Sequence, residues 1–497
     1  MAENNMISAF KNGKRITKLL KNEKTISIIS PVNNKKISEF IKCNEKDVND
    51  IVEQSYKSYK SGIWKNDIRF RSNVLRNIGN VLGKHLDRLA IMETEQIGRP
   101  LREMRLQLSR LPEWFEYYSS LIRVHEDSIK PFNGNYLNYV KRVPLGVVCQ
   151  ITPWNHPLLI TIKKLAPALA AGNSVIVKPS ELAPNSIIEL AEICKEAGLP
   201  DNIFNVVLGD GETGSYLIKN KLISKIDFTG GPQTGRIIGK VAGDNLCGYV
   251  AELGGKSPMI VFNDVDLEHV VNGTLFGTFI ASGQTCIAGT RILVEESIFD
   301  KFVYKFVLKA KDLILGDPFD QKTHLGPVIT SKQLDYIHKI VMKSLKEGGK
   351  LLCGGRKYEK LKEGNYYEPT VIVGDHKNII FHEELFGPVV AICSFKTKEE
   401  AIKLANSTKY GLGCSIWTNN LSRAHTVAQK IDSGIIWVND HHKNDPSSPW
   451  GGLTKESGIG RENGIDAYHE YTQTRSIIVN CDEYKSDWFG DITTRYS

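Results

Sequence analysis

The chain has 497 residues, of which 41% are hydrophobic and 24% charged, and its net charge is +8 at pH 7. This balance is that of a globular protein, and the length predicts about two or three domains with an ample core. The positive charge is spread along the chain, and even the Lys-rich stretch 11–24 is interspersed with Asn, Ile and Glu. We therefore expect a solvated surface there and no nucleic-acid partner.

Neither a membrane span nor a disulfide framework is expected. The best apolar run is interrupted by Lys163 and Lys164, which argues against a bilayer-spanning helix. The N-terminus lacks the apolar core of a signal peptide. The nine cysteines are scattered without a CxxC pair, which is typical of reduced thiols in the cytosol. We therefore expect a cytoplasmic protein with no membrane partner.

The first elements in chain order are strands, and helices follow. Residues 25–42 alternate on either side of a Pro-Asn turn, which predicts two strands. Residues 46–122 predict helices, because apolar residues such as Val74 and Ile78 recur at three- and four-residue spacing. Residues 136–142 predict a strand outside the main succession.

Apolar strands alternate with helices over the next hundred residues. The strands are expected at 146–152, 174–178, 204–208 and 225–229, and the helices at 157–171, 184–198, 212–220 and 232–243. This alternation predicts a parallel sheet that is covered by helices on both faces. A second alternating set runs from about 255 to 440, and a last strand is expected at 474–479. The predicted fold class is α/β.

Two glycine-rich loops are candidates for a phosphate site. Gly209 to Gly214 fits the pattern G-x-G-x-x-G, and Phe228 to Gly235 forms a second glycine-rich turn. Each loop lies between a predicted strand and a predicted helix. Each can therefore present backbone N–H groups and a helix N-terminus to a pyrophosphate. The pattern alone does not choose between them.

Cys286 lies in a run of small and apolar residues, 279–289. A thiol in such a run is either an inert core residue or a nucleophile, and a nucleophile needs a base and an oxyanion stabiliser. No metal site is expected. The adjacent pair His441-His442 lacks the spacing of a ligand set, and no second histidine follows His382 as in a zinc motif.

Seven groups of short motifs occur in order along the chain. They are Pro153-Trp154-Asn155, Lys178-Pro179-Ser180-Glu181, Phe228-Thr229-Gly230-Gly231, Glu252-Leu253-Gly254-Gly255-Lys256, Gly283-Gln284-Thr285-Cys286, Glu384-Leu385-Phe386-Gly387-Pro388, and Pro449-Trp450-Gly451-Gly452 with Ser457-Gly458-Ile459-Gly460-Arg461-Glu462. Together they resemble the NAD(P)-dependent aldehyde dehydrogenase superfamily, in its hydrolytic, non-acylating branch. In that family the Phe-Thr-Gly loop lies beside the cofactor phosphates. The resemblance therefore favours the second glycine loop and leaves the first as a structural turn.

The resemblance implies three parts. A Rossmann-like NAD-binding domain would take residues 1–125 and 145–254, and an α/β catalytic domain with a parallel sheet would take residues 255–455. A small β oligomerisation unit would combine residues 126–144 with residues 456–497. The strands of this unit pair across subunits in relatives, which implies a homodimer or a homotetramer.

The resemblance also implies the chemistry. Cys286 would attack the aldehyde carbonyl, and Asn155 would stabilise the oxyanion together with the backbone N–H of Cys286. Hydride passes to the cofactor and leaves a thioester, and Glu252 would activate the water that hydrolyses it. Lys164 and Glu462 match a proton relay behind this base in some relatives, although an ordinary ion pair explains them about as well.

The cofactor implied by the resemblance is NAD. The residues that would hold it are Trp154, Lys178, Glu181, Thr229, Gly230, Gly231, Gly235, Leu253, Glu384 and Phe386. Lys178 and Glu181 would contact the adenosine ribose, where a carboxylate repels a 2′-phosphate and so disfavours NADP. Gly231 departs from the Ser of many relatives, which removes one donor to the pyrophosphate.

The substrate implied is a small-molecule aldehyde. Its tunnel maps to His156, Leu159, Lys163, Ile280, Ile287 and Trp450. Relatives that take betaine aldehyde or aminoaldehydes surround the cation with aromatic residues. Trp450 fits such a cage, but His156 and Lys163 replace two aromatic positions, and a lysine repels a quaternary ammonium. The expected substrate is therefore a polar, hydroxylated, aromatic or anionic aldehyde. If Lys163 points away and the pocket is permissive, betaine aldehyde or an aminoaldehyde is the alternative.

Other functions are weighed against hydrolytic oxidation. An enzyme that passes the acyl group to coenzyme A tends to lack the acid at position 252, so Glu252 favours hydrolysis. A decarboxylating semialdehyde dehydrogenase is a further variant. A non-enzymatic structural or binding protein needs no intact site, and the joint presence of Cys286, Glu252 and Asn155 speaks against that role.

Overall fold

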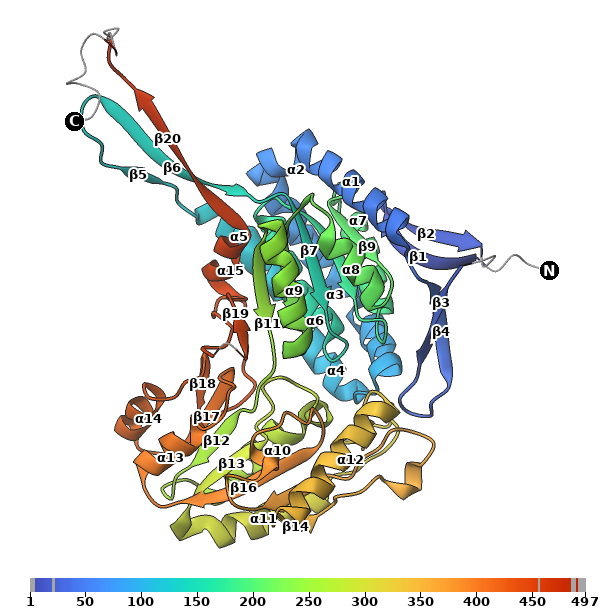
Figure 1. The fold of residues 1–497 in the computed structure, drawn as a ribbon, viewed down its shortest axis with the longest axis vertical. Coiled ribbons are helices and arrows are strands. Elements are labelled where there is room, and N and C mark those ends of the chain that lie inside the picture. Colours follow the sequence, from blue (N-terminus) through green and yellow to red (C-terminus); the bar gives the residue numbers. More distant parts are fainter. Residues whose placement is uncertain (1–4, 20–22, 455, 484–488, 490–497) are drawn as a thin grey trace.

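The computed structural model describes residues 5–19, 23–454, 456–483 and 489, and these form three sheets and a separate hairpin (Figure 1). The predicted domains and oligomerisation unit include residues 1–4, 20–22, 455, 484–488 and 490–497, which lie outside the described residues. Two large sheets lie one beyond the other, and a narrow arm of strands projects from the first (Figure 1).

The first sheet has eight strands in the order β19-β11-β10-β7-β8-β9-β1-β2. Neighbours from β11 to β9 are parallel, whereas β19, β1 and β2 pair antiparallel at the two edges. The bounds are β1 Asn5–Lys11, β2 Lys14–Leu19, β7 Val147–Thr152, β8 Ser174–Pro179, β9 Phe204–Val207, β10 Ile223–Thr229, β11 Gly248–Glu252 and β19 Gly458–Ile459.

Helices cover both faces of this sheet, because alternate side chains of each strand enter different cores. Val148 of β7 packs into one core, and its neighbours Val147 and Cys149 pack into the other. The first core is covered by α3 (Ile68–Ile97), α4 (Leu101–Leu108), α5 (Pro112–Val124), α6 (Pro157–Ala170) and α7 (Asn185–Glu196). The second is covered by α1 (Glu45–Ser61), α8 (Gly211–Lys219) and α9 (Pro232–Asn245), and the short α2 spans Ile63–Asn66.

The second sheet has seven strands in the order β14-β15-β16-β13-β12-β17-β18, and only the edge pair β14–β15 is antiparallel. The strands are β12 Pro258–Val261, β13 Arg291–Glu295, β14 Lys350–Cys353, β15 Thr370–Val373, β16 Val389–Phe395, β17 Gly413–Trp417 and β18 Ile435–Val438. The helices are α10 (Leu267–Phe279), α11 (Phe299–Lys311), α12 (Ser331–Lys346), α13 (Lys398–Ala405) and α14 (Leu421–Ala428). Four 3₁₀ turns complete it: η1 (Ile280–Gly283), η2 (Glu296–Ile298), η3 (Glu359–Leu361) and η4 (Ile379–Phe381).

The projecting arm is a three-stranded antiparallel sheet in the order β20-β6-β5 (Figure 1). Its strands are β5 (Ser128–Lys130), β6 (Tyr136–Pro144) and β20 (Thr472–Asn480). The separate hairpin pairs β3 (Thr25–Ile29) with β4 (Lys36–Ile41), and α15 (Gly464–Glu470) precedes the last strand and packs on α6.

The predicted strands and helices correspond to observed ones. Some observed strands, β2 and β19 among them, were not predicted. The stretch 11–24 was expected to be only a solvated surface, but β2 within it pairs with β1 at the edge of the first sheet. The β1–β2 pair contacts α1 through polar side chains; Lys18 of β2, for example, pairs with Asp47 of α1 at 2.6 Å. Residues 458–459 pair with β11, so they lie in the first sheet rather than with the arm. The division into domains stays a prediction.

Candidate active site

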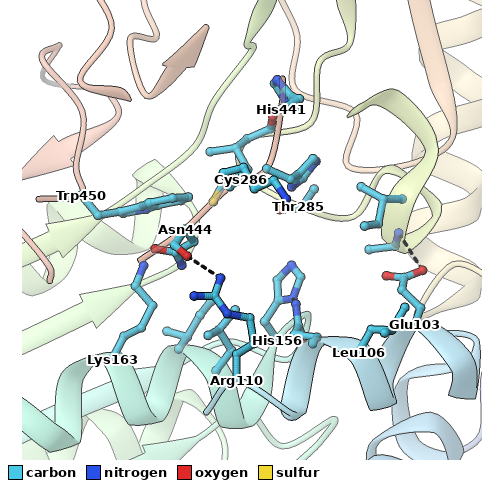
Figure 2. A pocket seen from close by; sticks show the side chains of 18 of the residues that line it. Glu103, Leu106, Arg110, His156, Lys163, Thr285, Cys286, His441, Asn444 and Trp450 are labelled. Atoms are coloured by element: carbon cyan, nitrogen blue, oxygen red, sulfur yellow. Dashed lines mark hydrogen bonds between the residues drawn. The ribbon is translucent and has the colours of Figure 1, made fainter. Parts of the chain in front are cut away.

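A cavity of about 380 Å³ lies where the first sheet and its helices meet the second half of the chain (Figure 2). Cys286 and Glu252 both line it. All the residues predicted for the substrate tunnel line it too, namely His156, Leu159, Lys163, Ile280, Ile287 and Trp450. The loop 440–444 contributes a further wall. The structure thus brings together residues that lie almost 300 positions apart in the sequence.

Cys286 follows a strained turn. Ala281 and Ser282 both have φ of 53° and Gly283 has φ of 72°, so three successive residues are left-handed. A Cβ atom on Gly283 would lie 2.2 Å from the carbonyl oxygen of Gly387, so any residue other than glycine would clash there. The turn therefore locks the loop before Cys286 against the loop that follows Glu384.

The Cys286 thiol lies in the cavity and has a raised pKa. Burial raises its pKa to about 12, and the nearby carboxyl of Glu252 acts in the same direction. Lys163 opposes this shift but is outweighed. A nucleophilic role for this thiol therefore requires a group that accepts its proton.

Asn155 lies between β7 and α6, and its side chain crosses to the Cys286 loop. Its amide nitrogen donates to the carbonyl oxygen of Gln284 at 2.9 Å, and the residue is 4% exposed. An amide nitrogen carries two N–H donors, so one remains for a developing oxyanion beside the thiol. This arrangement favours the role predicted for Asn155.

Glu252 is the last residue of β11 and is 4% exposed. Neither of its carboxylate oxygens has a hydrogen-bond partner within the part of the chain that the structure describes. Burial, and after it the charge of Glu462, raises the pKa of Glu252 well above its usual value, against the opposing effect of Lys163 and Lys164. A carboxylate of raised pKa is suited to accept a proton near neutral pH.

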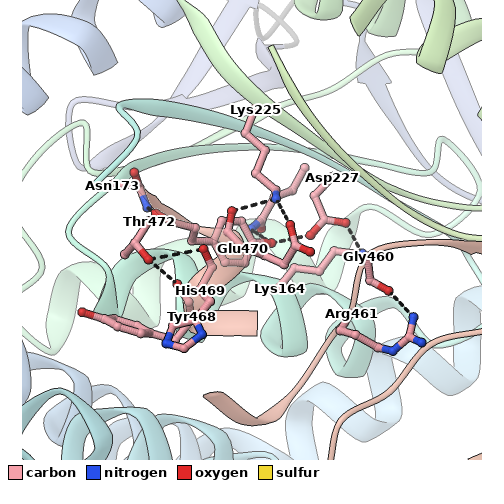
Figure 3. A network of polar contacts seen from close by, with 12 residues as sticks. Lys164, Asn173, Lys225, Asp227, Gly460, Arg461, Tyr468, His469, Glu470 and Thr472 are labelled. Atoms are coloured by element: carbon pink, nitrogen blue, oxygen red, sulfur yellow. Dashed lines mark hydrogen bonds and ion pairs between the residues drawn. The ribbon is translucent and has the colours of Figure 1, made fainter. Parts of the chain in front are cut away.

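Behind Glu252 lies a buried chain of ion pairs. Glu462 pairs with Lys163 at 2.7 Å and with Lys164 at 2.6 Å, and Lys164 also binds Asp227. Burial alone would raise the pKa of Glu462, but the two lysines outweigh it and hold that pKa well below its usual range. Figure 3 shows Lys164 and Asp227 in a wider polar network, in which Lys225 pairs with Glu470 at 2.7 Å.

Lys163 faces the cavity rather than pointing away from it (Figure 2). Its ammonium nitrogen lies 4.2 Å from the centroid of the Trp450 ring, as well as in the ion pair with Glu462. Trp450 is tied to Glu462 by two backbone hydrogen bonds of 2.7 and 2.8 Å. The lysine therefore covers one face of the aromatic ring that a cationic substrate would use.

Several residues predicted to hold the cofactor lie at the start of α9 or in the Glu384 loop. Gly231 precedes α9 without a side-chain cap, so the first N–H groups of that helix are available to a phosphate. Asp210, by contrast, already caps α8 through the N–H of Glu212 at 3.0 Å. These caps favour the loop 228–235 over 209–214.

Other contacts in this region also fit a nucleotide. The hydroxyl of Thr229 is buried without a hydrogen-bond partner among the described residues. A Cβ atom on Gly235 would lie 2.7 Å from the side chain of Leu253, which explains the glycine. The ammonium of Lys178, in β8, lies 3.9 Å from the carboxylate of Glu181, which follows that strand.

The Glu384 loop closes the other side of this region. The carboxylate of Glu384 accepts the N–H of Gly255 at 3.0 Å, and burial raises its pKa to about 7 against the effect of that bond. The rings of Trp154 and Phe386 meet edge to face with centroids 5.6 Å apart. Gly230 lies between Thr229 and Gly231, and a Cβ atom on it would be 2.5 Å from the Phe228 ring.

The adjacent histidines at the cavity wall contact backbone carbonyl oxygens. His441 binds the carbonyl oxygen of Ile287 through Nε2 at 2.8 Å. No group of three or more His, Cys, Asp or Glu side chains within the described residues is placed to hold a metal ion. In the same part of the chain, no helix has the length and apolar character that a bilayer crossing requires.

Several cavity residues were not identified from the sequence. Four further lining residues lie in and around α4, namely Arg99, Glu103, Gln107 and Arg110. Helical periodicity could not single them out, because they are ordinary polar residues of an amphipathic segment. The one sequence feature near them is Pro100, which follows Arg99 at the start of α4. A proline there restricts the backbone at the helix start, but it does not indicate a ligand-binding residue.

Comparison with known proteins agrees with this geometry. Residues 19–477 match the aldehyde dehydrogenase family. The betaine aldehyde dehydrogenase of Bacillus subtilis is 36% identical over 475 residues, which are 94% of this chain and 96% of that protein. The (Z)-2-((N-methylformamido)methylene)-5-hydroxybutyrolactone dehydrogenase of Acinetobacter baylyi is 39% identical over 445 residues, which are 88% of this chain and 90% of that protein.

Among solved structures, betaine aldehyde dehydrogenase from Staphylococcus aureus in complex with NAD+ superposes with a TM-score of 0.94 at 35% identity and covers 98% of this chain and 97% of that one. The chain belongs to the aldehyde dehydrogenase family. It is an oxidoreductase that acts on aldehydes, and the predicted family, fold class and reaction are confirmed.

The raised pKa of Cys286 predicts slow alkylation of the cofactor-free protein. With a pKa of about 12, only about 10⁻⁵ of the thiol is thiolate at pH 7, so iodoacetamide should modify it about tenfold faster with each added pH unit up to about pH 10. Peptide mass spectrometry measures the rate, with the exposed Cys481 as an internal control that reacts faster. A Cys286 rate at pH 7 equal to that of Cys481 would contradict the burial argument.

Proposed function

We propose that this aldehyde dehydrogenase oxidises a polar, hydroxylated, aromatic or anionic aldehyde and releases the free carboxylic acid. The cofactor is NAD. The observation that carries the substrate class is the ammonium of Lys163, which lies in the cavity 4.2 Å from the centre of the Trp450 ring. A substrate whose far end is a cation meets a like charge there, whereas a hydroxyl or carboxylate meets a donor.

The residues around α9 and the Glu384 loop would hold NAD. The free N–H groups at the start of α9 and the unpartnered hydroxyl of Thr229 suit a pyrophosphate. Glu181, together with Lys178, suits the hydroxyls of the adenosine ribose. Glu384 and Phe386 would hold the nicotinamide end near the thiol. When bound, the cofactor supplies a hydride acceptor.

The first half of the reaction uses Cys286 and Asn155. The thiolate of Cys286 attacks the aldehyde carbon, and the carbonyl oxygen becomes an oxyanion that the free N–H of the Asn155 amide and the backbone N–H of Cys286 stabilise. Because the resting thiol is neutral, its proton goes to Glu252, whose oxygens are free of other partners in the same cavity. Loss of hydride from the adduct then leaves a thioester on Cys286.

The second half of the reaction is hydrolysis. The proton that Glu252 took from the thiol first leaves, so that Glu252 is a carboxylate again. It then accepts a proton from water as that water attacks the thioester, and its raised pKa suits this step near neutral pH. Lys164 and Glu462 form the ion-pair chain behind the base, through which the collected proton would leave. A free carboxylic acid is thus the product, in preference to transfer of the acyl group to coenzyme A.

Glu252→Gln tests the hydrolytic half. Loss of the base should lower the steady-state rate of NADH formation by about 10²–10⁴-fold, because the thioester persists. Intact-protein mass spectrometry should detect an acyl adduct on Cys286 in this variant. The Cys286→Ala variant is the control and should show no adduct. Unchanged formation of the free acid by Glu252→Gln would refute the proposed role of this carboxylate.

Betaine aldehyde or an aminoaldehyde is the second candidate substrate. It is supported by the substrate named for the Bacillus and Staphylococcus relatives and by the presence of Trp450 in the cavity. Two like charges at about 4 Å repel by about 4 kcal/mol at an effective dielectric constant of about 20. The pairing of Lys163 with Glu462 reduces this repulsion. A remaining penalty of about 1.4 kcal/mol on the cationic substrate would still lower its kcat/KM about tenfold.

A pair of aldehydes of equal shape separates the two candidates. Betaine aldehyde and 3,3-dimethylbutanal differ only by a cationic nitrogen in place of a carbon. The wild-type enzyme should prefer the neutral aldehyde by about tenfold in kcat/KM, and Lys163→Met should remove most of this preference.

Lys443→Met is the matched control for this measurement, because Lys443 lines the cavity but is exposed. The preference of Lys443→Met for the neutral aldehyde, as a ratio of kcat/KM, should stay within about twofold of the wild-type ratio. A wild-type preference for betaine aldehyde, or a ratio that Lys163→Met leaves unchanged, would favour the second candidate.

The projecting arm supports a homodimer or a homotetramer. Its strands leave large apolar side chains in solvent: Ile129 is 74% exposed, Leu137 41% and Ile478 51%. A free strand edge with such side chains is suited to pair with a second copy. Analytical ultracentrifugation of the full chain should give a dimer or tetramer, and Ile478→Glu should shift it towards monomer. A wild-type monomer at micromolar concentration would contradict this proposal.

A further inference from the structure

His156 is a polar side chain at an otherwise mainly apolar part of the cavity. It immediately precedes α6, is 9% exposed, and reaches into the cavity on the side of Thr285 and Cys286 (Figure 2). Nearby parts of the lining are hydrocarbon, including Leu159 and Ile280. An imidazole here needs a physical explanation, because a buried polar group without a partner is costly.

One nitrogen of the ring has two partners. Nδ1 lies 2.6 Å from Nη1 of Arg99, and it lies 3.0 Å from Nε2 and 3.3 Å from Oε1 of Gln107. A guanidinium has five N–H donors and no acceptor, so the contact with Arg99 requires a lone pair on Nδ1. A neutral imidazole carries one proton, which must then lie on Nε2. The tautomer of His156 is thus set by Arg99.

Arg99 is held in place for this contact. It is 3% exposed, it is ion-paired with Glu103, and its Nη1 also donates to Oε1 of Gln107 at 3.0 Å. The second carboxylate oxygen of Glu103 accepts the N–H of Ala281, in the turn before Cys286, at 3.3 Å. Glu103 offsets the charge of Arg99 and links this cluster to the catalytic loop.

The charges around His156 keep it uncharged. Burial lowers its pKa well below the usual value, and the cationic or ionisable groups that act on it, namely Arg99, His442 and Lys163, lower it further. The carboxylate of Glu103 is paired with Arg99 instead. No hydrogen bond from Nε2 to another described residue competes for its proton.

We propose that His156 determines substrate specificity by donating a hydrogen bond from Nε2 to an oxygen on the side chain of the aldehyde. Arg99 and Gln107 are positioning residues, because they act on the substrate through the tautomer of His156 that they fix. The acceptor is a hydroxyl, ether, carbonyl or carboxylate oxygen, and a pure hydrocarbon chain leaves the donor unpaired. This inference rests on the proposed function and narrows its substrate class to aldehydes with an acceptor oxygen.

The tautomer is tested without any substrate. Nitrogen-15 NMR of histidine-labelled, cofactor-free full chain, with His156→Phe to assign the signals, should show a neutral ring protonated at Nε2 from pH 5.5 to pH 8. A ring protonated at Nδ1, or an imidazolium at pH 7, would overturn the proposal. This result does not depend on whether the enzyme accepts any tested aldehyde, so it is separable from a failure of the proposed function.

The donor itself is tested with ethers, which accept hydrogen bonds but do not donate them. The matched pairs are 3-methoxypropanal with pentanal, and 4-methoxybenzaldehyde with 4-ethylbenzaldehyde. The wild-type enzyme should prefer the ether of at least one pair by about tenfold in kcat/KM or more, because the hydrocarbon leaves a buried donor unpaired.

Two variants complete this test. His156→Phe should abolish the ether preference, measured as the ratio of kcat/KM within each pair, and His156→Gln should restore part of it through its amide N–H. Equal ratios in the wild type and His156→Phe would overturn the proposal, as would a wild type without any ether preference. If the wild type oxidises none of these aldehydes with NAD, the proposed function fails, and the NMR result still decides the tautomer.

Discussion

The ion-pair chain from Lys163 through Glu462 and Lys164 to Asp227 is the constraint on which the site depends. All four side chains are almost completely buried, and they come from α6, β10 and the segment after Trp450. Removal of one member of such a chain leaves a buried charge without a partner, which typically costs about 3–5 kcal/mol. These ion pairs therefore fix the position of α6 relative to the segment that carries Trp450, and with it the width of the cavity.

The same chain separates the two acids of the site. Glu462 lies between two lysines, which hold its pKa low, whereas Glu252 has no hydrogen-bond partner among the described residues and its pKa is raised by burial and by the charge of Glu462. Two carboxyl groups of equal chemistry thus differ in proton affinity, and the higher affinity of Glu252 is what assigns the role of base to it. The cysteine needs that base, because its own pKa is also raised by burial.

Much of the fold and of the site could be predicted from the chain itself. Alternation of apolar strands and helices predicted the parallel core of the first sheet, since burial on both faces requires apolar residues on both sides of each strand. The β1–β2 hairpin was missed, because it lies at a sheet edge and its Lys-rich strand owes its place to pairs such as Lys18 with Asp47. The cluster of Arg99 and His156 was missed for a related reason: its members lie 57 residues apart and each alone is an ordinary polar residue.

Sequence by itself determined the reaction class of this protein, because Cys286, Glu252, Asn155 and the glycine turns are local motifs whose chemistry or backbone geometry tolerates few other residues. Only the tertiary structure decided where the charges lie. It placed Lys163 in the cavity, on Trp450 and paired with Glu462, and it set the proton of His156 on Nε2 through Arg99. The protonation and pairing of a buried group depend on what surrounds it in space, and residues far apart in the chain supply those surroundings.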